Sequence, residues 1–484
     1  MPHHSTLPDP ERAARLAAAF VPLLGADAVL LTHEDQRPFE CDGLPVYRQL
    51  PLLTLLPHNA DQVQQIMRYC HQHGVAVVPR GAATGLSGGA LPHADAVLLS
   101  LARLDRILSL DPVTALARVE PGVRNLAISE AAAVHGLYYA PDPSSQIACT
   151  IGGNVAENSG GVHCLKYGLT VHNLLALQLI CADGERLSIG SEALDSAGYD
   201  LLALLTGSEG MLGVVVEVTV RLLPKPESTR VALAAFATVE AAGDAVAAII
   251  GAGIIPAGLE MMDQLAVQAV EDFVHAGYPR DAAALLLCEL DGAESDVTAQ
   301  MAQVVQLLHD RHASEVRLAR DEAQRLLFWK GRKNAFPALG RIAPDYYCMD
   351  GTIPRQHLAR VLNRINQLST EYGLPVANVF HAGDGNLHPL ILYDANAPGA
   401  LERTEELGGK ILELCVAMGG SITGEHGVGM EKLNQMCAQF SDAELAQFRR
   451  VRAAFDPDGR LNPGKAIPEL SRCAEYRALG PAHG

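Results

Sequence analysis

The chain of 484 residues lacks the features that mark nucleic-acid-binding proteins. It has 37 Lys and Arg against 55 Asp and Glu, which gives a formal net charge of −18, and no basic run is present. Contact with a nucleic-acid backbone requires clustered Lys and Arg, so the composition argues against a nucleic-acid partner. An anionic small substrate stays compatible, because it needs only a local positive group or a metal.

Long apolar runs, targeting signals and paired cysteines are also missing. The longest apolar runs have the length of strands, whereas a membrane-spanning helix needs about 20 apolar residues. The first twenty residues lack a basic start followed by an apolar stretch and a cleavage site. Ten cysteines are scattered without a CxxC pair. We therefore expect a cytoplasmic protein with reduced thiols, no transmembrane segment and no iron–sulfur cluster held by this chain alone.

What is present favours a globular protein of more than one domain. The chain is 49% hydrophobic and 19% charged, and its length favours two or three domains. Apolar and polar residues alternate over 214–222 as in a half-buried strand, and two prolines follow, so we place a domain boundary after residue 225. From residue 230 a strand–helix pattern occurs twice, which predicts an α+β domain with helices on one face of a sheet.

Five small-residue or glycine-rich stretches lie before that boundary. They are PRGAATGLSGGA (79–90), PDPSSQ (141–146), TIGGNVAENSGG (150–161), KYG (166–168) and GSEGMLGV (207–214). Glycine permits close approach of the backbone, so successive N–H groups can converge on a phosphate. The first stretch matches neither GxGxxG nor GxxxxGK[ST], which argues against NAD-type and NTPase sites. The stretches could be turns between strands, but five in one domain favour an extended ligand with a pyrophosphate.

Together with HAGDGNLH (381–388), GEHGVG (424–429) and LNPGK (461–465), these stretches resemble the FAD-linked D-2-hydroxyacid dehydrogenases. The resemblance implies an α+β protein of the vanillyl-alcohol-oxidase or PCMH type, which oxidises a 2-hydroxyacid to the 2-oxoacid and passes a hydride to flavin N5. It divides the chain into an FAD-binding domain (1–225, with an N-terminal extension to about residue 50), a substrate or cap domain with a metal site (226–435), and a segment that returns to the FAD domain (436–484).

The resemblance also implies which residues contact FAD. These are Pro79, Arg80, Gly81, Ala82, Ala83, Thr84, Gly85, Leu86, Ser87, Pro141, Asp142, Ser144, Ser145, Thr150, Gly152, Gly153, Asn154, Asn158, Gly161, Glu209, Gly210, Gly213, Val214 and Asn462. Many relatives in the wider fold attach FAD through a histidine of the first glycine stretch. No histidine lies between Arg80 and Ala90, so we expect FAD to be bound non-covalently.

Two histidines seven residues apart, His381 and His388, flank a glycine turn. If Asp384 and Gly385 form a two-residue hairpin turn, the histidines pair directly, with Cβ atoms about 4.5–5.5 Å apart. They could then bind one metal ion, or they could be structural residues of a half-buried hairpin. Glu425, flanked by glycines, is the candidate third ligand, and the resemblance implies the same three residues as ligands of a divalent metal, usually zinc.

Two further residues match catalytic positions of the family. His426 matches the base, and a group with a pKa of about 6.5 suits removal of a hydroxyl proton near neutral pH. Arg332 matches the arginine that binds the substrate carboxylate, a task for which the guanidinium fork is well shaped. In a regular strand Glu425 and His426 would face opposite ways, so both can serve one site only if the glycines break the strand.

Three positions bear on the substrate. Relatives with a dicarboxylic substrate carry polar residues where this chain has Phe336, Cys348 and Leu390. A second carboxylate would face apolar groups there, so we expect a short substrate, glycolate or D-lactate. The alternatives are a D-2-hydroxyglutarate-type dehydrogenase, a non-catalytic flavin-binding subunit of a multi-subunit oxidase, and an FAD enzyme of the same fold with non-redox or cell-wall chemistry.

The electrons of the reduced flavin need an acceptor other than oxygen. The sequence offers no cluster ligands, so we expect a quinone or partner proteins. The resemblance implies partner subunits, one flavin-binding and one with iron–sulfur clusters, through which the chain would lie at the periphery of the inner membrane.

Overall fold

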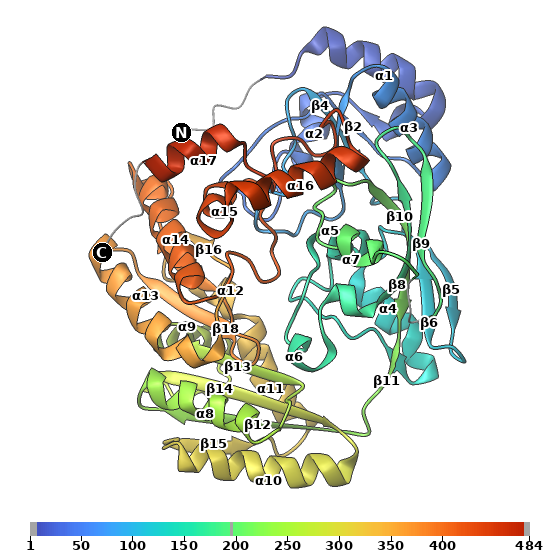
Figure 1. Cartoon of the computed structure of the whole chain (residues 1–484). Coiled ribbons are helices and arrows are strands. Elements are labelled where there is room, and N and C mark those ends of the chain that lie inside the picture. Colours follow the sequence, from blue (N-terminus) through green and yellow to red (C-terminus); the bar gives the residue numbers. More distant parts are fainter. Residues whose placement is uncertain (1–6, 194–196, 479–484) are drawn as a thin grey trace. The chain divides into compact units, whose positions relative to one another are not determined.

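The structure is a computed structural model that describes residues 7–193 and 197–478 (Figure 1). The chain forms two compact units, each built from separate segments. Among the described residues, the first unit holds the chain up to 161, then 168–225, and the chain from 425 onward; the second unit holds 162–167 and 226–424. No helix of the described chain has the length and apolar character that a membrane crossing requires.

The first unit begins with a four-stranded sheet. Strands β2 (Leu53–Leu55), β4 (Ala96–Ser100) and β3 (Ala76–Arg80) are parallel, and β1 (Val29–Leu30) pairs antiparallel with β2. Helices α1 (Pro10–Leu24) and α3 (Ala60–Gln72) bury their apolar stripes in the same core, and α2 (His33–Gln36) lies between them in sequence. The stripe of α3 is at most 1% exposed and consists of Val63, Ile66, Met67 and Cys70.

A second, antiparallel sheet completes this unit. Its order is β5 (Ile107–Asp111), β6 (Leu116–Val119), β10 (Val214–Arg221), β8 (Leu174–Ile180) and β9 (Arg186–Gly190). A tight turn at Asp183-Gly184 joins β8 to β9, and Gly184 adopts φ 84° there. Helices α4 (Asn125–Ala132), α5 (Ile151–Glu157) and α7 (Leu201–Leu205) contribute to the core of this sheet, and β7 (Leu137–Tyr138) pairs with β11 (Leu223–Pro224).

The C-terminal segment belongs to the first unit. Val451 and Phe455 of α16 (Asp442–Phe455) pack against the core of the antiparallel sheet, and Leu461 is part of the core of the parallel sheet. The segment returns at Glu425, earlier than the expected residue 436. The reason is that the loop after Glu425 is hydrogen-bonded to this unit, for example by Met430 N to Ser87 O at 3.0 Å.

Two of the ten cysteines form a disulfide, which corrects the expectation of reduced thiols throughout. Cys437 of α15 (Leu433–Gln439) is bonded to Cys473 of α17 (Leu470–Ala478), 36 residues further on. The other eight cysteines are free thiols. Spacing alone could not predict this pair, because α16 lies between the two helices in sequence and only the folded segment brings α15 and α17 into contact.

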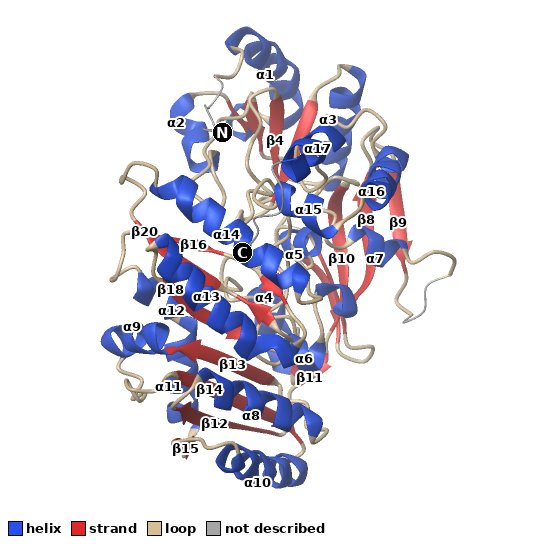
Figure 2. Cartoon of the chain, turned by 60° about the vertical axis from the view of Figure 1, so that its left-hand side comes forward, coloured by secondary structure: helices blue, strands red, loops and turns tan. Residues whose placement is uncertain are grey.

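The second unit is built on a nine-stranded sheet (Figure 2). Its main order is β15 (Glu315–Leu318), β12 (Ser228–Phe236), β14 (Ala284–Gly292), β13 (Gly258–Asp263), β18 (Val376–His381), β19 (Asn386–Leu387) and β17 (Gly351–Thr352), and β20 (Pro389–Tyr393) pairs with both β18 and β16 (Asp345–Cys348).

Helices cover both faces of this sheet, which corrects the expectation of one covered face. Helices α8 (Val239–Gly251), α10 (Glu294–Asp310), α13 (Leu358–Tyr372) and α14 (Ala400–Ala417) pack on one side, and α9 (Gln264–Val274), α11 (Glu322–Lys333) and α12 (Ala335–Leu339) on the other (Figure 2). The sequence of β14 explains this, because its first seven residues are all buried, as in a strand covered on both faces.

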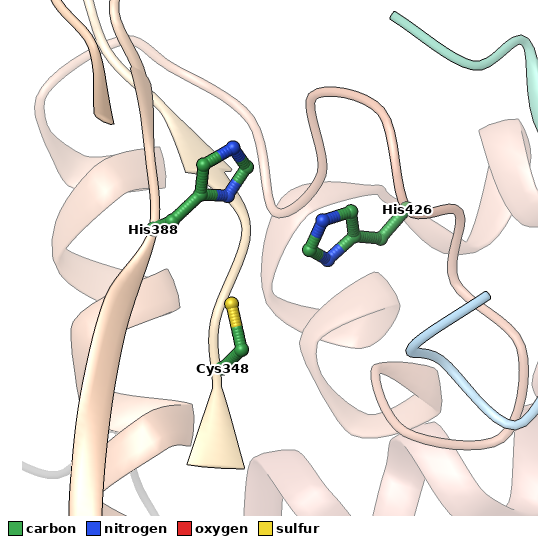
Figure 3. A group of neighbouring side chains, drawn as sticks. All are labelled: Cys348, His388 and His426. Carbon is green, nitrogen blue, oxygen red and sulfur yellow. The ribbon is translucent and has the colours of Figure 1, made fainter. Parts of the chain in front are cut away.

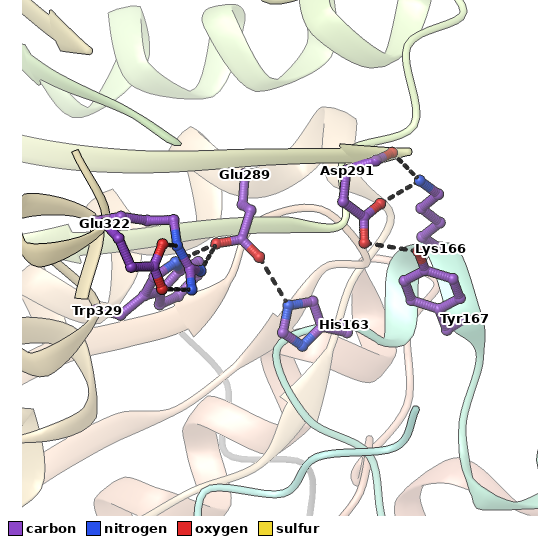
Figure 4. A network of polar contacts seen from close by, with 8 residues as sticks. His163, Lys166, Tyr167, Glu289, Asp291, Glu322 and Trp329 are labelled. Carbon is purple, nitrogen blue, oxygen red and sulfur yellow. Dashed lines mark hydrogen bonds and ion pairs between the residues drawn. The ribbon is translucent and has the colours of Figure 1, made fainter. Parts of the chain in front are cut away.

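A six-residue segment of the expected FAD domain, 162–167, instead belongs to the second unit (Figure 4). It includes α6 (Cys164–Tyr167). Asp291 of β14 pairs with Lys166 and accepts a hydrogen bond from the Tyr167 hydroxyl at 2.7 Å, and Glu289 lies 3.2 Å from His163 Nε2. These polar contacts bind the segment, including Lys166 and Tyr167 of the KYG stretch, to the sheet.

Candidate active site

Glycines let the predicted FAD loops of the first unit approach one another. A Cβ on Gly81 would lie 2.4 Å from Thr150 Oγ1, and a Cβ on Gly210 would lie 2.5 Å from Pro79 Cγ. A Cβ on Gly161 would lie 2.4 Å from the Asp142 carbonyl oxygen. Such distances exclude any side chain, so the stretches 79–90, 141–146, 150–161 and 207–214 are brought together as the sequence predicts.

The LNPGK segment closes this group of loops. Asn462 is 1% exposed, and its Nδ2 donates to Gly89 O at 2.9 Å and to Glu209 O at 2.7 Å. Lys465 Nζ donates to Gly89 O and Leu91 O at 3.0 and 2.7 Å, and burial lowers the pKa of Lys465 to about 8. Lys465 was not among the predicted site residues, although its place in the motif was a signal that could have indicated it.

Asn125 is a second residue that sequence reasoning missed. Its Nδ2 donates to Pro141 O and to Asn154 Oδ1, both at 3.0 Å, and so links two of the glycine stretches. It lies outside every motif, so no pattern could have indicated it. Arg80 is buried, and its Nη1 donates to Phe39 O and Ala90 O, so its guanidinium stabilises the 79–90 loop by hydrogen bonds to the backbone.

The loops fit a phosphate-bearing ligand such as FAD. Three of their buried polar atoms have no hydrogen-bond partner among the described residues: Ser87 Oγ, Thr150 Oγ1 and Glu157 Oε2. Such atoms in a native fold require a ligand or water. Burial, with a further contribution from nearby Glu209, raises the pKa of Glu157 well above its ordinary value, which favours a neutral carboxyl that can donate a hydrogen bond.

Glu209 holds the loop that carries two predicted site residues, Glu425 and His426. Its carboxylate accepts hydrogen bonds from Val428 N and Gly429 N, each at 2.7 Å. Burial raises the pKa of Glu209, and these two N–H groups act in the opposite direction. Residues 425 and 426 do not lie in a strand, so their side chains need not face opposite ways. His426 Nε2 lies 3.9 Å from Glu425 Oε1.

In the second unit the histidine hairpin forms, but in a register that corrects the prediction. His381 pairs with Asn386 and Asn378 pairs with Pro389, so His388 lies opposite residue 379 instead of His381. The turn has four residues, with Gly385 at φ 86° donating its N–H to His381 O at 3.1 Å. A shift of two residues keeps both histidines on one face, because side chains alternate with period two.

The two imidazoles are buried and close together. Their ring centroids lie 5.1 Å apart at an interplanar angle of 87°, and the exposed fractions of His381 and His388 are 7% and 3%. Histidine nitrogens and carboxylate oxygens are common zinc ligands, so His381 and His388, together with the predicted ligand Glu425, have the donor atoms that suit a divalent metal.

Glu260 of β13 joins His381 to Arg332, and sequence reasoning missed it. Its Oε1 lies 2.7 Å from His381 Nδ1, and its Oε2 accepts from Arg332 Nε at 2.9 Å and Nη2 at 2.7 Å. Burial acts to raise the pKa of Glu260, but the charges of His381 and Arg332 outweigh it and the pKa is lowered. One buried carboxylate therefore contacts both a predicted metal ligand and the predicted substrate arginine.

Asp350 plays a comparable part near His388. It is 0% exposed, and its Oδ1 lies 4.0 Å from His388 Nδ1. Its carboxylate accepts hydrogen bonds from Asn386 Nδ2 at 2.8 Å, Thr423 Oγ1 at 2.6 Å and Gly424 N at 3.0 Å. Asp350 thus fixes the backbone directly before Glu425.

Apolar side chains adjoin the histidine pair. Cys348 of β16 pairs with Leu390 of β20, two residues after His388 and on the same face. Figure 3 shows Cys348 and His388 projecting to the same side, and it labels His426 on the loop of the first unit. Phe336 packs edge-on against Tyr346 at 5.8 Å. All three positions used in the substrate argument therefore lie in the second unit, and Cys348 and Leu390 adjoin His388.

The comparisons with known proteins establish the class. A family described as "FAD binding domain" matches residues 51–190, and one described as "FAD linked oxidases, C-terminal domain" matches residues 225–466. The structure also superposes on substrate-bound p-cresol methylhydroxylase with a TM-score of 0.81 at 16% identity, covering 97% of this chain and 99% of that one. The predicted PCMH-type FAD-binding fold is confirmed.

Sequence relatives then establish the family. The chain is 64% identical over 478 residues to glycolate oxidase subunit GlcD of Escherichia coli, covering 99% of this chain and 96% of that protein. It is 33% identical over 423 residues to a D-lactate dehydrogenase of Archaeoglobus fulgidus, covering 86% and 92%. The chain belongs to the FAD-linked 2-hydroxyacid oxidoreductases, as the motifs predicted.

Proposed function

We propose that this chain oxidises glycolate or D-lactate, with a divalent metal held by His381, His388 and Glu425. The observation that carries the proposal is the pair of buried imidazoles, 5.1 Å apart, next to an arginine that shares a carboxylate with one of them. Glu425 is included because it follows Gly424, whose N–H is fixed by the carboxylate near His388. When bound, FAD supplies a two-electron acceptor and the metal supplies Lewis acidity.

Arg332 binds the substrate carboxylate in this proposal. A guanidinium has five N–H donors, so two contacts to Glu260 leave donors for a ligand. His426 accepts the proton of the α-hydroxyl at an imidazole nitrogen, and Glu209 supports this role by fixing the loop that carries His426. FAD is held non-covalently by the glycine loops and Asn462.

The short substrate is supported by the residues beside the histidines. Cys348 and Leu390 are 3% and 0% exposed and offer no hydrogen-bond donor that suits a second carboxylate. A dicarboxylic acid would lose hydration there without compensation. The names of the two relatives, one a glycolate oxidase subunit and one a D-lactate dehydrogenase, support the two candidate substrates.

The electron acceptor in this proposal is a quinone or a set of partner subunits. The E. coli relative is named as a subunit, which supports an assembly for this chain as well. A flavin-binding and an iron–sulfur partner would carry the electrons onward. The cytoplasmic location expected from the sequence, with attachment to the inner membrane only through such partners, belongs to the same proposal.

The test is an anaerobic titration of the FAD-bound chain with glycolate, D-lactate, L-lactate and D-2-hydroxyglutarate, followed by flavin absorbance. Glycolate and D-lactate should bleach the flavin, and D-2-hydroxyglutarate should do so at least about 10-fold more slowly, because its second carboxylate is poorly solvated. Faster reduction by D-2-hydroxyglutarate would refute the short pocket. Bleaching by none of the acids would favour a non-catalytic flavin subunit or non-redox chemistry.

The variant His426→Ala tests the base. FAD should remain bound while reduction by glycolate is lost, and the exposed control His309→Ala on α10 should behave like the wild type. Reduction of His426→Ala at the wild-type rate would remove His426 from this role.

A further inference from the structure

We infer that Glu260 is a positioning residue that orients His381 for metal binding and Arg332 for carboxylate binding through one shared side chain. The inference rests on the proposed function, because it presupposes that His381 is a metal ligand. It goes beyond that function by assigning a role to a residue outside the ligand set and outside every sequence motif.

The sheet itself brings Glu260 and His381 together. β13 and β18 are antiparallel, and Glu260 is the register partner of His381, so their side chains project to the same face from adjacent strands. Arg332 reaches this face from the last turn of α11. All three residues are at most 7% exposed, so none of their contacts competes with bulk water.

The carboxylate determines which nitrogen of His381 carries the proton. An ionised carboxylate only accepts hydrogen bonds, so the 2.7 Å contact requires a proton on His381 Nδ1. In the neutral imidazole the lone pair is then on Nε2, the nitrogen that a metal would use. Carboxylates that fix the tautomer and ring orientation of a ligating histidine contribute about 10- to 100-fold to metal affinity.

The other oxygen of Glu260 serves Arg332. Nε and Nη2 both donate to Oε2, so each carboxylate oxygen has a separate task. A glutamine has only one oxygen, and its NH₂ group would face either the His381 N–H or the Arg332 N–H groups. Glu260→Gln therefore cannot keep both contacts, and it should weaken the binding of the metal and the binding of the substrate carboxylate.

Asp350 does not repeat this arrangement at His388. Its Oδ1 is 4.0 Å from His388 Nδ1, which is longer than a hydrogen bond, and its carboxylate binds the backbone and side chains of the 423–424 segment. Asp350 thus does not act on His388 as Glu260 acts on His381.

Glu289 provides a matched control in the same sheet (Figure 4). It is 4% exposed and also contacts an arginine and a histidine, with Oε2 accepting from Arg325 Nη1 at 3.0 Å and Oε1 lying 3.2 Å from His163 Nε2. Its Oε2 also accepts from Trp329 Nε1 at 2.5 Å, so its partners are other residues than His381 and Arg332. Glu289→Gln therefore removes an equally buried charge without altering the predicted metal ligands.

The experiment measures Zn²⁺ affinity of the full FAD-bound chain by competition with a chelator, and Co²⁺ binding by visible absorption. Glu260→Gln should weaken Zn²⁺ binding about 10- to 100-fold and raise the KM for glycolate. Glu289→Gln should keep both values. Glu260→Asp retains the charge but withdraws it by one methylene, so it should lose a measurable part of the Zn²⁺ affinity, though less than Glu260→Gln.

The possible failures are distinct. If the wild type binds neither metal, the proposed metal site and this inference both fall. If the wild type binds Zn²⁺ and folded Glu260→Gln binds it equally well, only the role of Glu260 is overturned. Should Glu260→Gln not fold, unchanged Zn²⁺ affinity in Glu260→Asp would overturn the inference in the same way. If Glu289→Gln lost as much Zn²⁺ affinity as the Glu260 variants, the loss would be a general effect of removing a buried charge, and the specific role of Glu260 would be refuted.

Discussion

Replacement of Glu209 by glutamine should loosen the loop that carries Glu425 and His426. In the structure Oε1 accepts from Val428 N and Oε2 from Gly429 N, each at 2.7 Å. Glutamine can keep one of these bonds, and its NH₂ group would meet the other N–H. A hydrogen bond to a charged group contributes about 1.5–3 kcal/mol, so local opening should become about 10- to 150-fold more frequent.

Hydrogen exchange of the FAD-bound chain, read by mass spectrometry on peptides that cover 425–431, measures this opening. The control is Glu217→Gln on β10, which removes a contact to Arg118 at 3.4 Å but none to the loop. Exchange in 425–431 should accelerate in Glu209→Gln alone, together with a lower kcat on glycolate. Unchanged exchange in a folded Glu209→Gln protein would refute the assignment of Glu209 as the residue that fixes this loop.

Two further predictions concern the C-terminal segment. Burial lowers the pKa of Lys465 from 10.5 to about 8, so the unfolded state binds more protons than the folded state between these pH values. The free energy of unfolding of the wild type should therefore rise by about 3 kcal/mol relative to that of Lys465→Met as pH increases through this window. The exposed control Lys225→Met should show no such trend. The Cys437–Cys473 disulfide closes a span of 36 residues, so replacing both cysteines by serine should lower the free energy of unfolding by about 4 kcal/mol in denaturant titrations. No change on reduction of the wild type would contradict this second expectation.

The fold was predictable from the sequence because its motifs mark places where only a special backbone fits. A Cβ on Gly81 or Gly210 would lie only 2.4 or 2.5 Å from a neighbouring atom, so the glycine stretches indicated correctly which loops of the first unit approach one another. The histidine hairpin was predicted, but the predicted register was wrong, since a turn containing Gly385 can have two or four residues. Because the register differs by two residues, both histidines still lie on one face of the sheet, as binding of one metal ion by both requires.

The residues that support the site were not predictable, for a common physical reason. Glu260, Asp350 and Asn125 act through contacts between elements far apart in sequence, as between Glu260 and His381, 121 residues apart. Local composition carries no trace of such contacts. The same holds for Asp291, whose contacts with Lys166 and Tyr167 bind the 162–167 segment to the second unit.

The segmentation of the two units has a consequence for synthesis on the ribosome. The described chain changes unit after residues 161, 167, 225 and 424, so the first unit lacks Leu461, Val451 and Phe455 of its cores until the last segment has emerged. The described part of the second unit is complete once residue 424 is made, because its early piece, 162–167, has already been synthesised. The second unit can therefore fold first on the nascent chain, and the first unit acquires its full cores only after its last described segment has been made.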